Sequence, residues 1–287
     1  MLEDLTMKDP KITAFVDMAI RHALQTPYLM DQLLALSAAH ASTKHNAEDA
    51  KVYQRAATGL QTRGLSSYNA AGSNMSEENC LPALLYSIFL AQHVLFDTFS
   101  IRADINTFMD SLAGSFKLCA GVRAVAGVHW PSIQRQSLDQ LGFDTAEEWN
   151  GDETGGGNVP EVSRLHDLVE KAGFNAPSAH ACTTAVNLLE KFIQPRDISE
   201  TALYRRANNV LQWPVLLPHA FIDMILQRRP EALVILGYFA VLVHDAREYW
   251  AFGNAGEFMV NAISAHLGSY WDEWLAWPNR VVCYSVN

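Results

Sequence analysis

Apolar residues recur at helical spacing along almost the whole chain of 287 residues, and this feature most constrains the fold. The segment 27–40 is typical, because its apolar side chains fall at positions i, i+3, i+4 and i+7 and share one helix face. Alternating patterns of the strand type are nearly absent, and 280–284 is the single candidate for a strand. The chain is therefore predicted to form an all-α fold, a single irregular bundle of roughly ten helices.

One segment interrupts this pattern clearly. The stretch 150–160 is rich in glycine and indicates a loop, while helical patterns of the same style lie on both sides of it. The sequence therefore predicts a single helical domain over 1–287 with a flexible surface loop at about 150–160. The segment 213–218 holds Pro214 and Pro218 and predicts a break between two helices, because proline cannot continue a helix interior.

The composition excludes several classes of protein. Acidic residues number 31 against 21 basic ones, so the net charge of −10 is opposite to the basic face of a nucleic-acid binder. The longest uncharged apolar run, 232–243, is shorter than the roughly 20 residues that span a bilayer. The four cysteines are too scattered for a disulfide framework or a CxxC zinc site. We therefore expect an intracellular protein, cytoplasmic or nuclear, without a membrane span and without direct contact with nucleic acid.

Tryptophan is concentrated towards the C-terminal end of the sequence, since five of the seven lie between residues 213 and 277. These five are Trp213, Trp250, Trp271, Trp274 and Trp277. One interpretation is a large aromatic core, because tryptophan is heavily buried on average. The other is the wall of a pocket for a bulky apolar ligand, since such pockets are mostly apolar and aromatic.

Carboxylates follow the two most apolar helical segments. Asp97 and Asp104 come after one of them, and Asp245 and Glu248 come at the end of the other. If these two ends meet, the carboxylates converge beside an apolar cavity and could hold Mg²⁺ for a diphosphate substrate. The plainer interpretation is solvated helix ends with ion pairs to Arg102 and Arg247. Adjacent-aspartate, HExxH, nucleophile-elbow, phosphate-loop and dinucleotide motifs do not occur in the sequence.

Four stretches in order carry a family resemblance. They are 27–40 (PYLMDQLLALSAAH), 96–130 with FDTFS and GVRAVAGVHW, 210–243 with VLQWPVLLP and RPEALVILGYFAVLV, and 250–278 ending in WDEWLAWP. Together they resemble the C-terminal regulatory domain of fungal zinc-cluster transcription factors of the sterol uptake control type. The resemblance covers nearly the whole chain, although no single motif is specific by itself.

The resemblance implies an all-helical domain that binds an apolar small molecule, a sterol in the best-understood members, among its C-terminal helices. Carried over residue by residue, it places seven residues in the pocket: Trp213, Phe221, Tyr238, Phe239, Trp250, Phe252 and Met259. The chain departs from the family at its start, because the six-cysteine zinc cluster is missing and the first cysteine is Cys80. It also has Leu-Cys-Ala at 118–120, where the family often has Leu-His-Arg. We therefore expect a domain without its DNA-binding module, either a fragment of a longer factor or a complete short protein.

Three functions follow from these observations. The first is binding of a sterol, terpenoid or polyketide-like molecule without a cofactor. The second is a biosynthetic enzyme of fungal secondary metabolism on the same scaffold, either a pericyclic cyclase or a non-canonical terpene cyclase. In the terpene cyclase, Asp97, Asp104, Asp245 and Glu248 would hold Mg²⁺, and Arg102, Arg123 or Arg247 would bind the diphosphate. The third is an interaction module that forms a homodimer through an exposed helix face.

Overall fold

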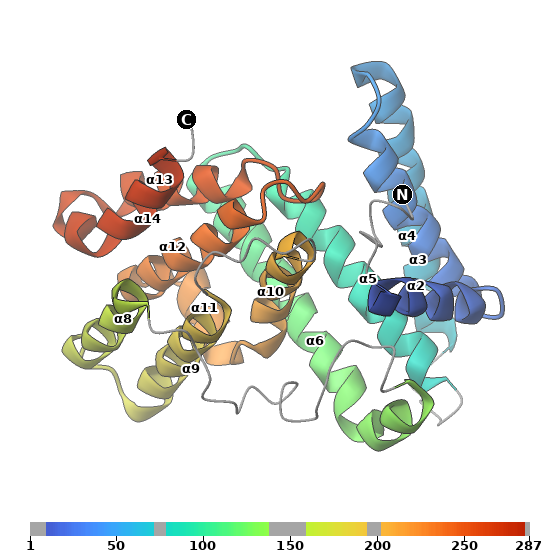
Figure 1. Ribbon diagram of the computed structural model, residues 1–287, viewed down its shortest axis with the longest axis horizontal. Coiled ribbons are helices and arrows are strands. Elements are labelled where there is room, and N and C mark those ends of the chain that lie inside the picture. The colour runs from blue at the N-terminus through green and yellow to red at the C-terminus, as the bar shows by residue number, and fades with distance from the viewer. Residues whose placement is uncertain (1–9, 72–78, 138–158, 194–201, 285–287) are drawn as a thin grey trace. The chain divides into compact units, whose positions relative to one another are not determined.

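A computed structural model describes residues 10–71, 79–137, 159–193 and 202–284 of the chain (Figure 1). Within these ranges it contains twelve α-helices, one short 3-10 helix and no strand. The predicted all-α fold is thereby confirmed. The segment 280–284, which we predicted as the single candidate strand, lies instead in the last helix, α14 (Asp272–Tyr284). Its short apolar run buries one side chain, Val282, on a helix face rather than alternating in a sheet.

The residues group into two compact units, and each is described here by itself. The first unit comprises 1–95 and 121–150, and the second comprises 96–120 and 151–287. Two helices, α5 (Cys80–Phe99) and α6 (Ile105–Ser137), contribute one part to each unit. The single domain over 1–287 stays a prediction. Most of the expected loop at about 150–160 lies outside the described residues, which resume at Val159 and Pro160.

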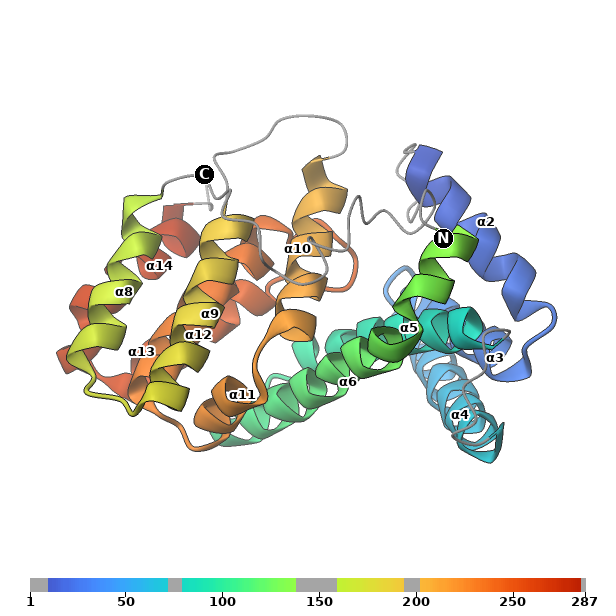
Figure 2. The same cartoon turned by 90° about the horizontal axis from the view of Figure 1, so that it is seen from below.

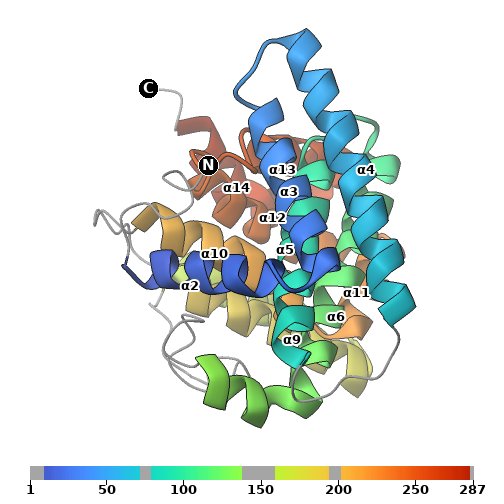
Figure 3. The same ribbon diagram turned by 90° about the vertical axis from the view of Figure 1, so that its right-hand side faces the viewer.

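The first unit contains a hairpin of two long helices, α3 (Pro27–Ser42) and α4 (Ala47–Ala71), which lie side by side in Figures 1 and 3. The two buried residues of α4, Ala57 and Gly64, are seven apart and therefore share the face that meets α3. A Cβ atom on Gly64 would lie 3.2 Å from the backbone oxygen of Tyr28. The small residues of α4 thus allow the two helix backbones to approach closely.

Polar as well as apolar contacts join α3 to the other helices of this unit. Asp31 accepts two hydrogen bonds from the guanidinium of Arg63 on α4. Gln32 is fully buried, and its Nε2 donates to the backbone oxygen of Phe89 and to Nδ1 of His93, both on α5. Helix α2 (Pro10–Ala23) adds an aromatic contact, since Phe15 lies 5.8 Å from Phe89 between ring centroids.

Helix α12 (Pro230–Asp245) forms the centre of the second unit, and every residue from Ala232 to His244 is buried. The helices that contact it are α8 (Pro160–Lys171), α9 (Ala176–Phe192), α10 (Ala202–Leu216), α11 (His219–Leu226), α13 (Ala255–Leu267) and α14. Figure 2 shows α8 and α9 alongside it. Helix α12 is apolar all round because it is covered on every side, which is the pattern of a central helix.

Helix α13 crosses α12 at a glycine. A Cβ atom on Gly256 would lie 2.4 Å from the backbone nitrogen of His244 and 2.5 Å from the backbone oxygen of Ala240. No side chain fits at this position without moving one of the two helices. Beyond α13 the chain turns at Gly268, which has a φ of 73°, and enters the 3-10 helix η1 (Ser269–Trp271).

The predicted break within 213–218 is found, but only at its end. Pro214 lies inside α10, which continues to Leu216, so the two helices separate at 217–218. Proline this close to a helix end removes one backbone hydrogen bond, and burial of Trp213 and Leu216 offsets that loss. Helix α12 ends at Asp245, so Asp245 and Glu248 do not lie on one helix.

Among the described helices, α5 alone is long and apolar enough to cross a bilayer by length and composition. Most of its apolar window is buried inside the protein, as in the core helix of a soluble domain. The described residues therefore contain no clear membrane span.

Candidate ligand-binding site

Four of the seven residues predicted to line a pocket are packed into the interior of the second unit. Trp213 is fully buried and stacks on Phe239, with ring centroids 4.4 Å apart and an angle of 16°. Phe221 and Phe116 meet the same indole edge to face, at 5.9 Å and 5.8 Å. The indole Nε1 donates to the backbone oxygen of Ala185 at 3.2 Å, which satisfies its one polar atom. These rings form an aromatic core, and Met259 is also fully buried, in α13.

Tyr238 belongs to a second group of rings, between α12 and α14. Its ring stacks on Trp277 at 5.2 Å, and its hydroxyl donates to the backbone oxygen of Trp274 at 3.1 Å. Tyr238 is buried, and burial raises the pKa of its phenol to about 12. The group fastens α14 to the central helix. Trp271, Trp274 and Trp277 are each partly exposed, so they do not form the large buried core that one interpretation predicted.

The remaining two predicted residues, Trp250 and Phe252, lie in a third group, which we call the Trp250 cluster. Its rings come from the end of α5 and from the turns between α12 and α13, and they are Phe96, Phe99, Tyr249, Trp250 and Phe252. The ring centroids of Phe96 and Trp250 are 5.0 Å apart, and those of Phe99 and Phe252, which meet edge to face, are 5.6 Å apart. Tyr249 contacts both Trp250 and Phe252, at 5.8 Å and 5.1 Å. Trp250 remains partly exposed, so the cluster reaches the surface.

Asp97 follows Phe96 directly and supplies the cluster with an ionisable group. The side chain is exposed to solvent, but desolvation by the packed surroundings raises its pKa to about 6. Desolvation also raises the pKa of the Tyr249 phenol well above its ordinary value. A carboxyl group that titrates near neutrality beside aromatic rings can donate or accept a hydrogen bond. Perturbed groups of this kind are enriched at functional sites.

The other predicted carboxylates have different surroundings. Asp104 is the residue before α6, and its carboxylate accepts hydrogen bonds from the backbone nitrogens of Asn106 and Thr107 and from the Thr107 hydroxyl. These bonds lower the pKa of Asp104 and identify it as a helix cap. Asp245 and Glu248 are exposed, at the end of α12 and in the following turn. In the described part of the chain, no three histidine, cysteine or acidic side chains are placed to hold a metal ion.

Two of the three predicted diphosphate-binding arginines have hydrogen-bond partners in their own chain. Arg102 donates to the backbone oxygens of Phe99 and Ile101 and to the side chain of Asn254, and it lies 5.1 Å from the Phe258 ring. Arg247 donates to the backbone oxygen of His244 at 3.1 Å. Arg123 is exposed on the part of α6 that belongs to the first unit. Arg102 and Arg247 thus bind their own chain, and the magnesium-dependent cyclase stays a prediction without a described site.

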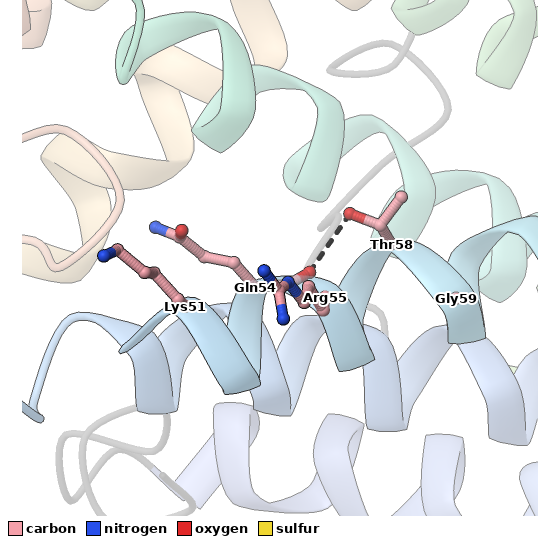
Figure 4. Close-up of a pocket in the computed structure, with 5 residues that line it drawn as sticks. All are labelled: Lys51, Gln54, Arg55, Thr58 and Gly59. Atoms are coloured by element: carbon pink, nitrogen blue, oxygen red, sulfur yellow. Dashed lines mark hydrogen bonds between the residues drawn. The ribbon is translucent and has the colours of Figure 1, made fainter. Parts of the chain in front are cut away.

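A hollow of about 360 Å³ lies on the first unit, on the exposed face of α4 (Figure 4). Its lining consists of Lys51, Gln54, Arg55, Thr58 and Gly59, and none of the residues predicted to bind ligand is among them. The hydroxyl of Thr58 donates to the backbone oxygen of Gln54, and Lys51 pairs with Glu48 at 3.1 Å. Its polar, charged lining does not suit an apolar molecule.

Several residues of the Trp250 cluster escaped the sequence reasoning. Phe96 and Phe99 are three apart at the end of α5, which is a usable signal for one helix face, but Tyr249 lies in an irregular turn without periodicity. Thr98 and Ser115 form a buried hydrogen bond of 2.6 Å that fixes this end of α5 against α6.

A scan against protein-family models, a search of curated proteins and a search of solved structures each found no match.

Proposed function

We propose that this chain binds an apolar small molecule of the sterol, terpenoid or polyketide type, as the resemblance to fungal regulatory domains implies. The Trp250 cluster is the proposed contact surface. The observation that carries the proposal is a packed group of five aromatic rings of which Trp250 reaches the surface, with Asp97, an exposed acid whose pKa is about 6, next to Phe96 in the chain. Ligand sites combine apolar walls with a few placed polar groups, and this cluster has both.

Asp97 supplies the polar contact in this proposal. With a pKa of about 6 the carboxyl is ionised at neutral pH, so it accepts a hydrogen bond from a ligand hydroxyl. Sterols and many terpenoids and polyketides carry one hydroxyl on an apolar skeleton. The exposed part of Trp250 then covers the skeleton while Asp97 binds its polar end. Binding needs no metal and no cofactor in this arrangement.

The test is a titration of the purified chain with dehydroergosterol, in which binding is measured by energy transfer from tryptophan to the sterol. We expect Trp250→Ala to weaken binding by at least tenfold, because the ring is removed from the contact surface. Asp97→Asn should weaken it several-fold. The matched control is Trp274→Ala, which removes another partly exposed tryptophan of the same unit outside the cluster and should leave the affinity unchanged.

The same titration with farnesol and with the polyketide emodin, read by native mass spectrometry, covers the two other ligand classes. Binding of any one of the three that Trp250→Ala weakens and Trp274→Ala does not supports the proposal. If none of the three binds, or if both tryptophan variants lose binding equally, the Trp250 cluster is not a ligand site.

A further inference from the structure

The contact between α8 and α14 shows how this chain binds its own cationic side chains. The guanidinium of Arg164 lies 5.2 Å from the centre of the Trp274 ring, and the ammonium of Lys171 lies 5.7 Å from it. Arg164 also donates to the carboxylate of Glu273, the residue just before that tryptophan, at 2.9 Å. An aromatic ring and a neighbouring carboxylate thus hold one arginine together.

Two aromatic residues and an acid also follow one another at 270–272, on a surface that we call the Tyr270–Asp272 surface. Tyr270 and Trp271 lie 5.5 Å apart between ring centroids at an angle of 78°, and Asp272 follows them. Within the described ranges, no cation lies over either ring, and the Asp272 carboxylate has no ion pair or hydrogen bond. The ring and carboxylate are present, and the cation is missing.

The exposure of this surface is unusual. Tyr270 is 85 % exposed, the highest value among the described large apolar side chains that are exposed, and Trp271 is partly exposed. Gly268 precedes them with a φ of 73°, a conformation that favours glycine and turns the chain into the 3-10 helix. Tyrosine and tryptophan are the residue types most enriched at the energetic centres of protein interfaces. Exposed aromatic area beside an unpaired acid therefore points to a partner.

We propose that the Tyr270–Asp272 surface docks an arginine side chain of a partner protein. Charge complementarity favours a cation, since Asp272 carries an unpaired negative charge and the faces of both rings are negative. Arginine suits it better than lysine, because a planar guanidinium can stack on an indole while its fork of N–H groups donates to a carboxylate. The chain uses this same arrangement internally for Arg164, Trp274 and Glu273.

The test is an NMR titration of the full-length ¹⁵N-labelled chain. The probe is the capped peptide Gly-Ser-Arg-Ser-Gly. Its binding is followed by the chemical shift of the Trp271 indole N–H, a signal that is assigned because it disappears in Trp271→Phe. We expect the arginine peptide to shift this signal, and a matched citrulline peptide, which is neutral but nearly the same shape, to bind at least tenfold more weakly. The lysine peptide should bind several-fold more weakly than the arginine peptide.

Variants separate this surface from general attraction to an acidic protein. Asp272→Asn, read at the Trp271 indole, and Trp271→Ala, read at the backbone amides of residues 270 and 272, should each weaken binding of the arginine peptide at least fivefold. Glu170→Gln, which removes an exposed acid on α8, is the matched control and should have no effect. The proposal is wrong if the Trp271 signal does not shift, or if the citrulline peptide binds as tightly as the arginine peptide. It is also wrong if tetramethylammonium binds more tightly than the arginine peptide, or if Glu170→Gln weakens binding as much as Asp272→Asn.

Discussion

Tyr86 and Tyr238 are both buried tyrosines that differ in the surroundings of the hydroxyl. Tyr238 donates to the backbone oxygen of Trp274, whereas the buried hydroxyl of Tyr86 has no hydrogen-bond partner among the described residues. A buried hydrogen bond contributes about 1 kcal/mol, and an unpaired buried hydroxyl costs a similar amount. We therefore expect Tyr238→Phe to lower the free energy of unfolding by about 1 kcal/mol, and Tyr86→Phe to leave it unchanged or raise it by up to about 1 kcal/mol.

Urea unfolding of the two variants measures this difference, and the pair serves as its own control because both substitutions remove one oxygen. Tyr86 packs against Tyr68 and Tyr28, with centroid distances of 4.6 Å and 5.4 Å that phenylalanine preserves. Equal destabilisation of both variants would show that the Tyr86 hydroxyl has a partner in solution, such as an internal water.

His93 makes the stability of the first unit depend on pH. The ring is buried, its Nδ1 accepts from Gln32, and burial lowers its pKa to about 4. The unfolded chain, with a histidine pKa near 6.5, then binds more protons than the folded chain between these two values. Stability is therefore full above about pH 6.5 and is lost as the pH falls towards 4.

Between pH 7 and pH 5 the loss from His93 is about 2 kcal/mol. His93→Gln retains an acceptor for Gln32 but cannot titrate, so its loss over the same pH range should be smaller by about that amount. The measurement is the melting temperature of both proteins at the two pH values. His244 is buried as well and its pKa is also lowered, so both proteins share that contribution and it cancels in the comparison. Parallel pH profiles would contradict the prediction.

At the scale of elements, α13 can cross α12 so closely only because Gly256 has no Cβ atom. Gly256→Ala places a Cβ 2.4 Å from the backbone of His244, so the helices must separate and we expect a loss of about 3 kcal/mol or more. Gly114→Ala is the matched control, because it lies inside α6 with nothing within 4 Å of the added atom. There alanine should raise stability by about 0.5–1 kcal/mol through its better helix propensity.

Thermal unfolding of the two glycine variants checks the sign of each change. Opposite signs from the same chemical substitution locate the effect in the helix crossing rather than in glycine itself. Stabilisation of both would show that α13 does not approach α12 so closely.

Helices were predictable where one local signal decides the structure. The helical spacing of 27–40 correctly predicts α3, which begins at Pro27. The strand candidate at 280–284 is helical, and α10 continues past Pro214 before the predicted break, because burial against α12 and the helices around it overrides local preference there. A short apolar run cannot by itself distinguish a strand from a buried helix segment.

The candidate site was less predictable than the fold. Aromatic residue type predicted burial for Trp213, and the resemblance placed Phe221 and Phe239 in a pocket. Neither could separate rings that fill a core from rings that reach the surface. That distinction depends on which helices pack together. The spacing of residues along one helix carries no information about its neighbours. Asp97 was selected as a carboxylate after an apolar helix, and its raised pKa comes from neighbours that the sequence does not identify.

At the scale of the whole molecule, two unbroken helices connect the two units. Helices α5 and α6 each run from one unit into the other, so neither unit can unfold completely without unwinding part of a helix that the other contains. Helix unwinding is cooperative along the chain. The two units should therefore unfold in one transition, in agreement with the single domain that the sequence predicts.

Hydrogen exchange on Val260→Ala tests this coupling. Val260 is fully buried in α13 of the second unit, and removing two methyl groups should cost about 1–2 kcal/mol. If unfolding is shared, the slowest amides of α3 in the first unit should lose as much protection as those of α12, because all of them exchange through the same global opening. Ala39→Gly in α3 gives the reverse experiment, since it weakens the first unit and should lower protection in α12 equally. Loss of protection confined to the unit that carries the substitution would show that the chain contains two independently unfolding units, despite the helices they share.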